Sequence, residues 1–240
     1  MDIVLVTGSS KGLGFSICNT LLENNYKVIG ISRTKSDKFI ELMNKYPDKL
    51  FFKEYDFNDI ANIKHLVKDI KKEFGSIYGL VNNAAIGVDG VLGTMHETDI
   101  SESIRVNIEA PIVLTKYVSR AMLVKQRGRI VNISSIIAST GFNGLSVYGA
   151  TKAALGGFTK SLCREIGKAN ITVNTISPGY MQTDMTSSLQ GDKLESIKRR
   201  SPLGQLAQVD DVASMVNYVL SPEAKNITGA DFTIDAGSTA

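Results

Sequence analysis

The sequence predicts an α/β fold, a doubly wound parallel sheet of seven strands with helices on both faces. The first observation behind this prediction is a regular alternation along the chain, in which short apolar runs are followed by segments with apolar residues at helical spacing. The second is that the connections between these segments are short. Parallel strands need crossover helices, and right-handed crossovers place those helices on both faces of the sheet.

The N-terminal third of the chain begins this alternation. Residues 3–6 form a short apolar run that ends at Thr-Gly, as expected of a buried strand, and the helix expected at 13–22 carries its apolar residues on one face. The following elements are expected, in order, as strand 26–31, helix 37–46, strand 51–55 and helix 60–74. The last two helices stop at Pro47 and Gly75, residue types that commonly end helices.

The rest of the chain continues in the same way. The expected elements are strand 78–81, a long helix 100–125, strand 130–133, helix 148–167, strand 172–176, helix 209–220 and strand 232–234. Residues 183–206 are polar, contain Gly191 and Pro202, and are expected to form a lid over the substrate. Because no linker, repeat or low-complexity tract is found, residues 1–240 are expected to form one domain.

The composition excludes several function classes. The 240 residues are 43% hydrophobic and 21% charged, and 27 basic and 24 acidic residues give a net charge of only +3, so no nucleic-acid surface is expected. The basic run Lys198–Arg199–Arg200 is expected to be a solvated loop or helix end. No apolar stretch reaches about 18 residues, so we expect no membrane span, and the first strand leaves no room for a signal peptide.

The sequence has only two cysteines and two histidines, few residues for a metal site or a disulfide. Cys18 and Cys163 lie among apolar helical residues and are expected to be buried thiols. Neither His65 nor His96 is near a cysteine in the sequence, so we expect no metal site. These features favour a cytoplasmic protein.

The segment after the first strand is rich in glycine. Its spacing is Gly8-x-x-x-Gly12-x-Gly14, and a helix follows. Glycines allow a tight turn, and the amide groups of a helix N-terminus attract phosphate. The spacing is neither G-x-G-x-x-G nor a P-loop, so a plain strand–helix turn remains an alternative. A hydrolase G-x-S-x-G elbow also matches formally, but no histidine follows His96 to complete a triad.

The end of the second expected strand bears on the choice of cofactor. In dinucleotide folds an acidic residue here binds the ribose hydroxyls, whereas a cation accepts a 2′-phosphate. Here Ser32 replaces the acid, Arg33 follows at once, and Lys11 lies in the glycine segment. These residues favour NADP(H) over NAD; the alternative for Arg33 alone is an ordinary surface arginine.

Three residues point to carbonyl chemistry. Tyr148 and Lys152 are four residues apart at the start of a helix and so share one face, while Ser134-Ser135 ends a strand 13 residues before the tyrosine. An ammonium group near a phenol favours phenolate and lowers the pKa of the tyrosine. A serine hydroxyl can hydrogen-bond an oxygen on which charge develops. The set fits reversible hydride transfer to a carbonyl.

Together these motifs resemble the short-chain dehydrogenases/reductases over nearly the full chain. The matching segments are Thr7-Gly-x3-Gly-x-Gly14, Asn82-Asn-Ala-Ala85, Asn107, Ser135, Tyr148-x3-Lys152 and Pro178-Gly179, in the family's order. Ala85 departs from the usual glycine. The resemblance implies a Rossmann-type fold and a homotetramer, and it assigns roles to individual residues.

The roles implied by the resemblance fall into two groups. Tyr148 would be the general acid, Lys152 would hold the nicotinamide ribose, Ser135 would bind the carbonyl, and Asn107 would hold a water of a proton relay. The implied cofactor-binding residues are Gly8, Ser10, Lys11, Gly12, Leu13, Gly14, Ser32, Arg33, Asp56, Phe57, Asn83, Ala84, Tyr148, Lys152, Pro178, Gly179, Met181 and Thr183.

Within the family the chain is most similar to 3-oxoacyl-[acyl-carrier-protein] reductases. That group docks its acidic carrier with two arginines, for which this sequence has Gln126 and Ala169; Arg127 and Lys168 are adjacent. Because of this similarity, the expected activity is NADPH-dependent reduction of a 3-oxoacyl thioester. Two alternatives stay open: a dehydrogenase or reductase of another alcohol, sugar or ketone, and a non-catalytic dinucleotide sensor.

Overall fold

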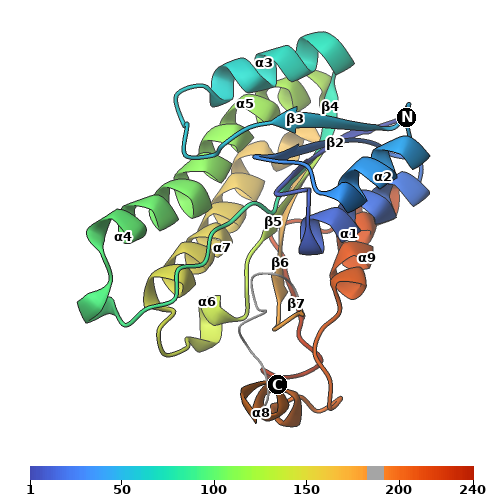
Figure 1. Cartoon of the computed structure of the whole chain (residues 1–240). Helices are drawn as coiled ribbons and strands as arrows, with labels where there is room; N and C mark the ends of the chain where they lie inside the picture. The colour runs from blue at the N-terminus through green and yellow to red at the C-terminus, as the bar shows by residue number, and fades with distance from the viewer. Residues whose placement is uncertain (183–191) are drawn as a thin grey trace.

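The computed structural model describes residues 1–182 and 192–240, with the backbone alone for 192–194. Its seven-stranded sheet has the order β3-β2-β1-β4-β5-β6-β7, and every neighbouring pair is parallel (Figure 1). The strands are β1 (Ile3–Thr7), β2 (Lys27–Ser32), β3 (Leu50–Glu54), β4 (Ile77–Asn82), β5 (Gly128–Ile133), β6 (Ile171–Pro178) and β7 (Asp231–Ile234). The predicted fold class and all seven predicted strands are confirmed.

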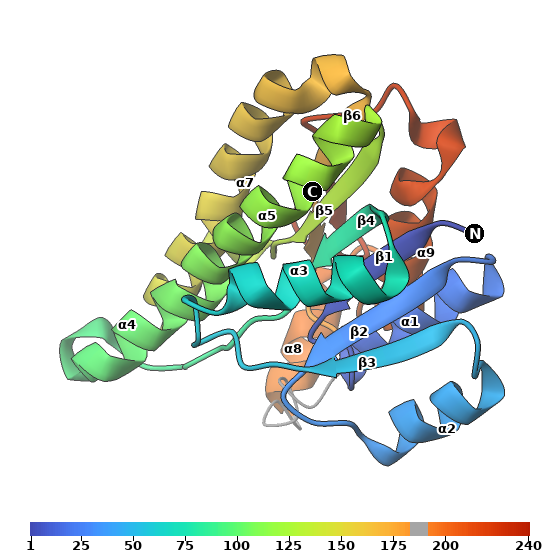
Figure 2. The same ribbon diagram turned by 90° about the horizontal axis from the view of Figure 1, so that it is seen from above.

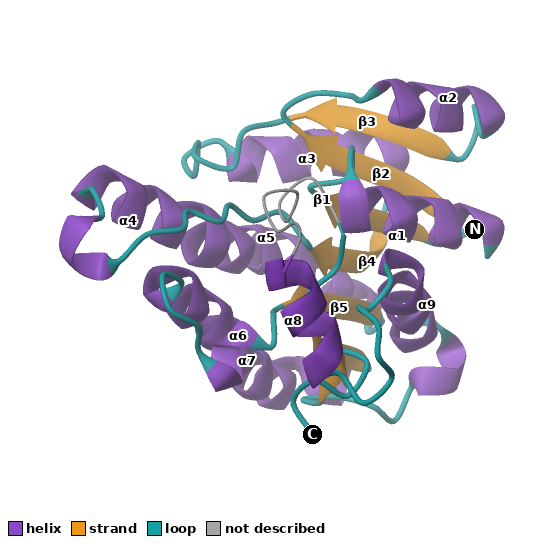
Figure 3. Cartoon of the chain, turned by 60° about the horizontal axis from the view of Figure 1, so that its bottom comes forward, coloured by secondary structure: helices purple, strands orange, loops and turns teal. Residues whose placement is uncertain are grey.

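Helices cover both faces of this sheet (Figures 2 and 3). One face carries α1 (Gly12–Glu23), α2 (Asp37–Lys45) and α9 (Val209–Leu220). The other carries α3 (Ile63–Phe74), α5 (Ala110–Lys125) and α7 (Ser146–Ile166). The remaining helices of the described chain are α4 (Glu97–Ile104), α6 (Ile137–Thr140) and α8 (Asp192–Arg200), and short 3-10 turns cover Leu92–Thr94, Gly167–Ala169 and Pro222–Ala224.

The alternation of side chains along the strands builds two separate cores. Val4 and Val6 of β1 pack with α1 and α9, whereas Leu5 between them packs with the helices of the opposite face. All three side chains are fully buried. Successive residues of a strand point to opposite faces, so an apolar run without polar interruptions is what a sheet covered on both sides requires.

The predicted helix 100–125 is only partly correct. Helical structure begins at Glu97, and Arg105–Glu109 forms a π-helical segment between α4 and α5. Pro111 lies in the first turn of α5 and has no backbone N–H to donate. Such π segments are uncommon and often occur at functional sites. Asn107 lies within this one.

Residues 192–200, within the segment expected to form a lid, fold into α8 (Asp192–Arg200), whereas residues 183–191 lie outside the described residues. A lid role for residues 183–206 stays a prediction. The last turn of α8 carries Lys198, Arg199 and Arg200, and cations there interact favourably with the negative end of the helix dipole. The short helix α6 was also not predicted. No helix in the described part of the chain is long and apolar enough to cross a membrane.

Candidate active site

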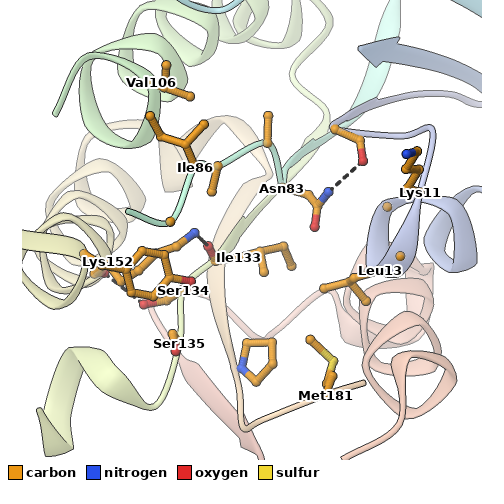
Figure 4. Close-up of a pocket in the computed structure, with 18 of the residues that line it drawn as sticks. Lys11, Leu13, Asn83, Ile86, Val106, Ile133, Ser134, Ser135, Lys152 and Met181 are labelled. Atoms are coloured by element: carbon orange, nitrogen blue, oxygen red, sulfur yellow. Dashed lines mark hydrogen bonds between the residues drawn. The ribbon is translucent and has the colours of Figure 1, made fainter. Parts of the chain in front are cut away.

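A cleft of about 690 Å³ opens at the carboxyl ends of the parallel strands (Figure 4). Ligand sites commonly have volumes of about 300–1,000 Å³. Segments that follow β1 to β6 line the cleft. In open α/β sheets this edge is where ligands bind.

The glycine segment after β1 is folded tightly against the neighbouring chain. Gly8 has φ +65°, and a Cβ on Gly14 would lie 2.0 Å from the Gly8 carbonyl oxygen. The Ser36 hydroxyl donates to the carbonyl oxygen of Ser10 at 2.5 Å. No side chain among the described residues caps the N-terminus of α1. The first-turn amides of α1 are therefore suited to an anionic ligand.

Thr7 joins this loop to the segment after β4. Its hydroxyl oxygen accepts from the backbone N–H groups of Asn83 and Ala84, both at 2.9 Å, and its O–H donates to the carbonyl oxygen of Val81 at 3.3 Å. The Asn83 amide in turn donates to the Thr7 carbonyl oxygen at 2.9 Å and to the Gly8 carbonyl oxygen at 3.2 Å. Thr7 is a structural member of the site that the sequence analysis quoted only as part of a motif.

The end of β2 presents cations to the cleft and no carboxylate. Arg33 and Lys11 are exposed and both line it, and Thr34 lies beside Arg33. Ser32 is buried, and its hydroxyl oxygen accepts from the Ser10 backbone N–H at 3.3 Å. Its side chain thus holds the loop between β1 and α1, and the side chains of Arg33 and Lys11 line this corner of the cleft.

Asp56 and Phe57 lie at the same end, after β3, and line the cleft. Asp56 is exposed and accepts from the backbone N–H of Asn58 at 2.9 Å. Phe57 is buried in the core on the side of α3 and meets the Tyr55 ring edge-on at 5.3 Å between centroids. The backbone and rim of this segment, more than the Phe57 ring, are open to a ligand.

The other end of the cleft brings together the residues expected to act on the carbonyl. Tyr148 and Lys152 lie one turn apart on α7, and the Lys152 ammonium nitrogen is 5.7 Å from the centre of the Tyr148 ring. Lys152 is buried and donates to the Ile133 carbonyl oxygen at 2.8 Å (Figure 4). The Ser134 hydroxyl donates to the Lys152 carbonyl oxygen at 2.9 Å. Ile133 at the end of β5 and Ser134 directly after it thus hold this turn of α7 in position.

The pKa shifts at this end follow mainly from burial. Burial raises the pKa of Tyr148 to about 12, a hydrogen bond with Ser135 acts in the opposite direction, and Tyr180 and Asp89 raise it further. Burial also lowers the pKa of Lys152 to about 8. The shift of Tyr148 is opposite to the one expected from the sequence, because desolvation of the phenolate outweighs the stabilising contacts. A phenol of this kind holds its proton at neutral pH and can donate it.

Asn107 does not line the cleft but supports its wall. Its Oδ1 accepts from the backbone N–H of Ile86 at 2.9 Å, and its Nδ2 donates to the Ile86 carbonyl oxygen at 2.9 Å and to the Thr151 hydroxyl at 3.1 Å. Both amide protons are therefore used within the chain. Asn107 thus links the π-helical segment to Ile86 in the wall of the cleft and to Thr151, the residue before Lys152. A water-holding role for Asn107 stays a prediction.

The outer part of this end was incompletely predicted. Phe142 and Tyr180 meet edge-on at 6.0 Å between ring centroids, and both line the cleft with Asp89. Phe142 lies in the segment between α6 and α7, and Tyr180 follows the Pro178-Gly179 motif. Nothing in the local sequence singled out Asp89.

Eighteen of the predicted site residues line this one cleft. They are Gly8, Ser10, Lys11, Gly12, Leu13, Gly14, Ser32, Arg33, Asp56, Phe57, Asn83, Ala84, Ser135, Tyr148, Lys152, Pro178, Gly179 and Met181. Thr183 lies outside the described residues. No group of three or more potential metal ligands occurs in the part of the chain that the structure describes.

The residues present fit a dinucleotide. The close approach of Gly14 to Gly8 leaves the backbone bare at the uncapped N-terminus of α1, where a pyrophosphate would lie. Lys152 and the Pro178-Gly179 segment line the opposite end, where a nicotinamide and its ribose would lie. The cleft thus joins an end whose backbone amides suit an anion to an end that carries Tyr148 and Lys152.

Known proteins of similar sequence support the interpretation of the cleft as a dinucleotide site. A sequence profile described as short chain dehydrogenase matches residues 2–194. The chain is 36% identical to the 3-oxoacyl-[acyl-carrier-protein] reductase of Escherichia coli K12 over 237 residues, which is 98% of this chain and 96% of that protein. It is 36% identical to the protein of the same name from Vibrio cholerae over 236 residues, covering 98% and 96%. The corresponding Staphylococcus aureus protein is 34% identical over 236 residues, covering 97% and 96%.

Proposed function

The chain belongs to the short-chain dehydrogenase family, and we propose that it catalyses the NADPH-dependent reduction of a 3-oxoacyl thioester to the 3-hydroxyacyl product. Family membership makes it an oxidoreductase that uses a nicotinamide dinucleotide and acts on a C=O/CH–OH pair. The single observation that carries the proposal is the joining, in one cleft, of a cationic phosphate end with Ser135, Tyr148 and Lys152.

The reaction needs a hydride and a proton at a carbonyl. When bound, the reduced nicotinamide supplies the hydride to the carbonyl carbon. The Ser135 hydroxyl donates a hydrogen bond to the carbonyl oxygen, and the Tyr148 hydroxyl delivers the proton to that oxygen as charge develops on it. The raised pKa of Tyr148 keeps this proton in place before the reaction. Lys152 holds the ribose hydroxyls and, when protonated, stabilises the phenolate that remains.

NADPH is preferred to NADH in this proposal because of charge. Lys11 and Arg33 flank the place where an adenosine 2′-phosphate would lie, and the end of β2 offers Ser32 where a carboxylate would repel the phosphate. An arginine can bind phosphate through two parallel hydrogen bonds. The exposed Arg33 side chain has no ion-pair partner among the described residues that would compete for it.

The choice of a 3-oxoacyl thioester rests on the cleft and on the relatives. The walls around Tyr148 are largely apolar, with Ile136, Ile137, Phe142 and Leu145 lining them. The proteins that match over nearly the full chain are named as reductases of 3-oxoacyl groups linked to acyl carrier protein. An apolar wall suits an acyl chain, which carries no charge at its reacting end.

The docking of a carrier protein has weaker support from this chain. Gln126 and Ala169 replace the expected arginines, and the neighbouring Arg127 is already bound to both carboxylate oxygens of Asp2 at 2.7 Å and lies over the Tyr78 ring at 4.2 Å. Arg127 is therefore a poor substitute. Lys168 is exposed and has no ion pair among the described residues.

Two further expectations are part of the proposal. The exposed Ile104, Ile112, Leu123 and Val124 on α4 and α5 support a homotetramer built on the long helices, which light scattering would measure. A cytoplasmic location stays a prediction from the sequence.

NADPH oxidation tests the substrate class. Acetoacetyl thioesters are compared with sugars, quinones and simple ketones, and reduction of the thioesters alone is expected. Equal or better turnover of a sugar or a simple ketone would replace the thioester with that substrate. No turnover of any carbonyl, with intact NADPH binding, would favour a dinucleotide sensor.

Fluorescence titration tests the cofactor. NADPH is expected to bind at least tenfold more tightly than NADH, and Arg33→Asp should remove most of that preference, since a tenfold ratio equals about 1.4 kcal/mol. If NADH binds as well as NADPH and the variant changes neither affinity, the NADPH assignment is wrong. Lys64→Asp, which changes an exposed lysine outside the cleft, serves as the control.

A further inference from the structure

The basic run at the end of α8 is not used by the proposed reaction. Lys198 is paired with Glu195 at 2.9 Å, whereas Arg199 and Arg200 are exposed and form no ion pair within the described chain. Figure 3 shows α8 lying across the carboxyl-end side of the sheet, the side on which the cleft opens. The end of α8, which carries Arg199 and Arg200, thus lies on the side of the sheet where the cleft opens.

The end of α8 is anchored to the C-terminal segment. Ser201 follows Arg200, is buried, and donates from its hydroxyl to the Ala236 carbonyl oxygen at 2.6 Å. The Leu203 backbone N–H donates to the same oxygen at 3.4 Å. A Cβ on Gly237 would lie only 3.0 Å from the Pro202 ring, so the two segments are in close contact. These contacts anchor the chain directly after Arg200 to the C-terminal segment.

Tyr180 connects this helix end with the reacting end of the cleft. Burial raises the pKa of Tyr180, the Asp89 carboxylate raises it further, and the Arg200 guanidinium lowers it. The Tyr180 ring meets Phe142 edge-on and lines the cleft together with Tyr148. Tyr180, in the wall of the cleft, is thus within electrostatic reach of a negative group at Asp89 and of a positive group at Arg200.

We propose that Arg200 binds the phosphate group of the pantetheine-type arm that carries the substrate thioester; this proposal rests on the proposed function. The acyl group and thioester, which are neutral, lie against Phe142 and Tyr180. The arm then leaves the cleft on the side of α8, where its phosphate meets the guanidinium. Arginine suits this role because its fork of N–H groups matches two phosphate oxygens.

Asp89 gives the arm its direction. This exposed carboxylate lies close enough to Tyr148 and Tyr180 to raise the pKa of both. An anionic group placed beside Asp89 would be repelled, so a phosphate is favoured at the Arg200 guanidinium instead, and a free 3-oxo acid is a poor substrate. The same carboxylate can accept hydrogen bonds from the amide N–H groups of a neutral arm.

The test compares two substrates that differ only in the phosphate. These are the acetoacetyl thioesters of pantetheine and of 4′-phosphopantetheine, measured by NADPH oxidation with wild type, Arg200→Gln and Lys198→Gln. Wild type should have about tenfold higher kcat/KM for the phosphorylated substrate, a preference worth about 1.4 kcal/mol. Arg200→Gln should lose it through a higher KM and leave kcat/KM for the pantetheine substrate unchanged. Lys198→Gln, on the same helix but ion-paired, should keep the preference.

The outcomes separate the two proposals. If wild type reduces both thioesters equally well, or if Arg200→Gln lowers both values of kcat/KM to the same extent, the phosphate site is wrong while the thioester assignment stands. If wild type reduces neither thioester but reduces another carbonyl, the proposed function fails and the phosphate site with it. Acetoacetyl-coenzyme A and the carrier-linked acetoacetyl group then distinguish the source of the arm, since both carry a phosphate at this position.

Discussion

The replacement Gly14→Ala probes the packing that creates the phosphate end of the cleft. Gly14 lies in the first turn of α1, and an added Cβ would lie 2.0 Å from the Gly8 carbonyl oxygen and 2.7 Å from the Asn83 amide nitrogen. Nonbonded heavy atoms rest about 3.5 Å apart, so α1 and the Gly8 turn would have to separate by about 1.5 Å. Gly8 is held by backbone contacts and cannot yield by rotating a side chain.

The free energy of unfolding lost in Gly14→Ala can be estimated in two parts. Overpacking of this kind costs about 3 kcal/mol, and the better helix propensity of alanine returns about 1 kcal/mol. A net loss of about 2 kcal/mol lowers the Tm by about 6 °C for a domain of this size. Displacing the α1 amides from the pyrophosphate position by about an ångström should weaken NADPH binding about a hundredfold.

Thermal unfolding and NADPH fluorescence titration measure both effects. Gly167→Ala is the matched control, because Gly167 has helical dihedral angles (φ −59°, ψ −35°) and nothing lies within 4 Å of its added Cβ. That variant should be as stable as wild type or slightly more stable, with unchanged NADPH affinity. A Gly14→Ala protein with wild-type Tm and wild-type Kd for NADPH would refute the packing argument.

Four other predictions concern the acid–base end of the cleft and the support of its glycine loop. Tyr148→Phe should lower kcat by about 10²- to 10⁴-fold, because the proton donor is lost, and leave the Kd of NADPH within threefold of wild type; retained turnover would assign the proton to another group. Because the pKa of Lys152 is lowered to about 8, kcat/KM for NADPH should fall as pH rises through about 8, whereas a fall only near pH 10.5 would place this lysine in water. Between about pH 8 and pH 10.5, Lys152 is protonated in the unfolded chain and largely neutral in the folded chain. The free energy of unfolding of wild type should therefore rise with pH relative to that of Lys152→Met. A constant difference between the two proteins in denaturant titrations would contradict this. Thr7→Val, which deprives the backbone N–H groups of Asn83 and Ala84 of their acceptor, should cost about 2 kcal/mol in denaturant unfolding, and no measurable cost would mean that these groups find other partners.

The elements that were predicted correctly are those whose signal is local. The run of apolar residues in β1 indicated a strand buried on both faces, and the structure divides Val4 and Leu5 between the two cores. The glycine spacing up to Gly14 indicated a tight backbone approach, and the contact with Gly8 shows the reason. A four-residue separation placed Tyr148 and Lys152 on one face of α7.

The features that were missed depend on residues far apart in the sequence. Asn107 is bound to Ile86, and Ser201 to Ala236, across loops whose paths the local pattern does not define. The π segment around Asn107 interrupts the predicted helix, although the spacing of apolar residues there gives no sign of an interruption. The direction of the Tyr148 pKa shift depends on burial, which spacing along a helix does not report.

The central claim is that this cleft transfers a hydride from NADPH to the ketone carbon of a 3-oxoacyl thioester. The most direct measurement incubates the enzyme with acetoacetyl-pantetheine and NADPH carrying deuterium at both C4 positions, followed by mass spectrometry of the product. The account predicts a 3-hydroxybutyryl thioester with one deuterium, located on carbon 3. An unlabelled hydroxyacyl product, or deuterium at any other carbon, would contradict it.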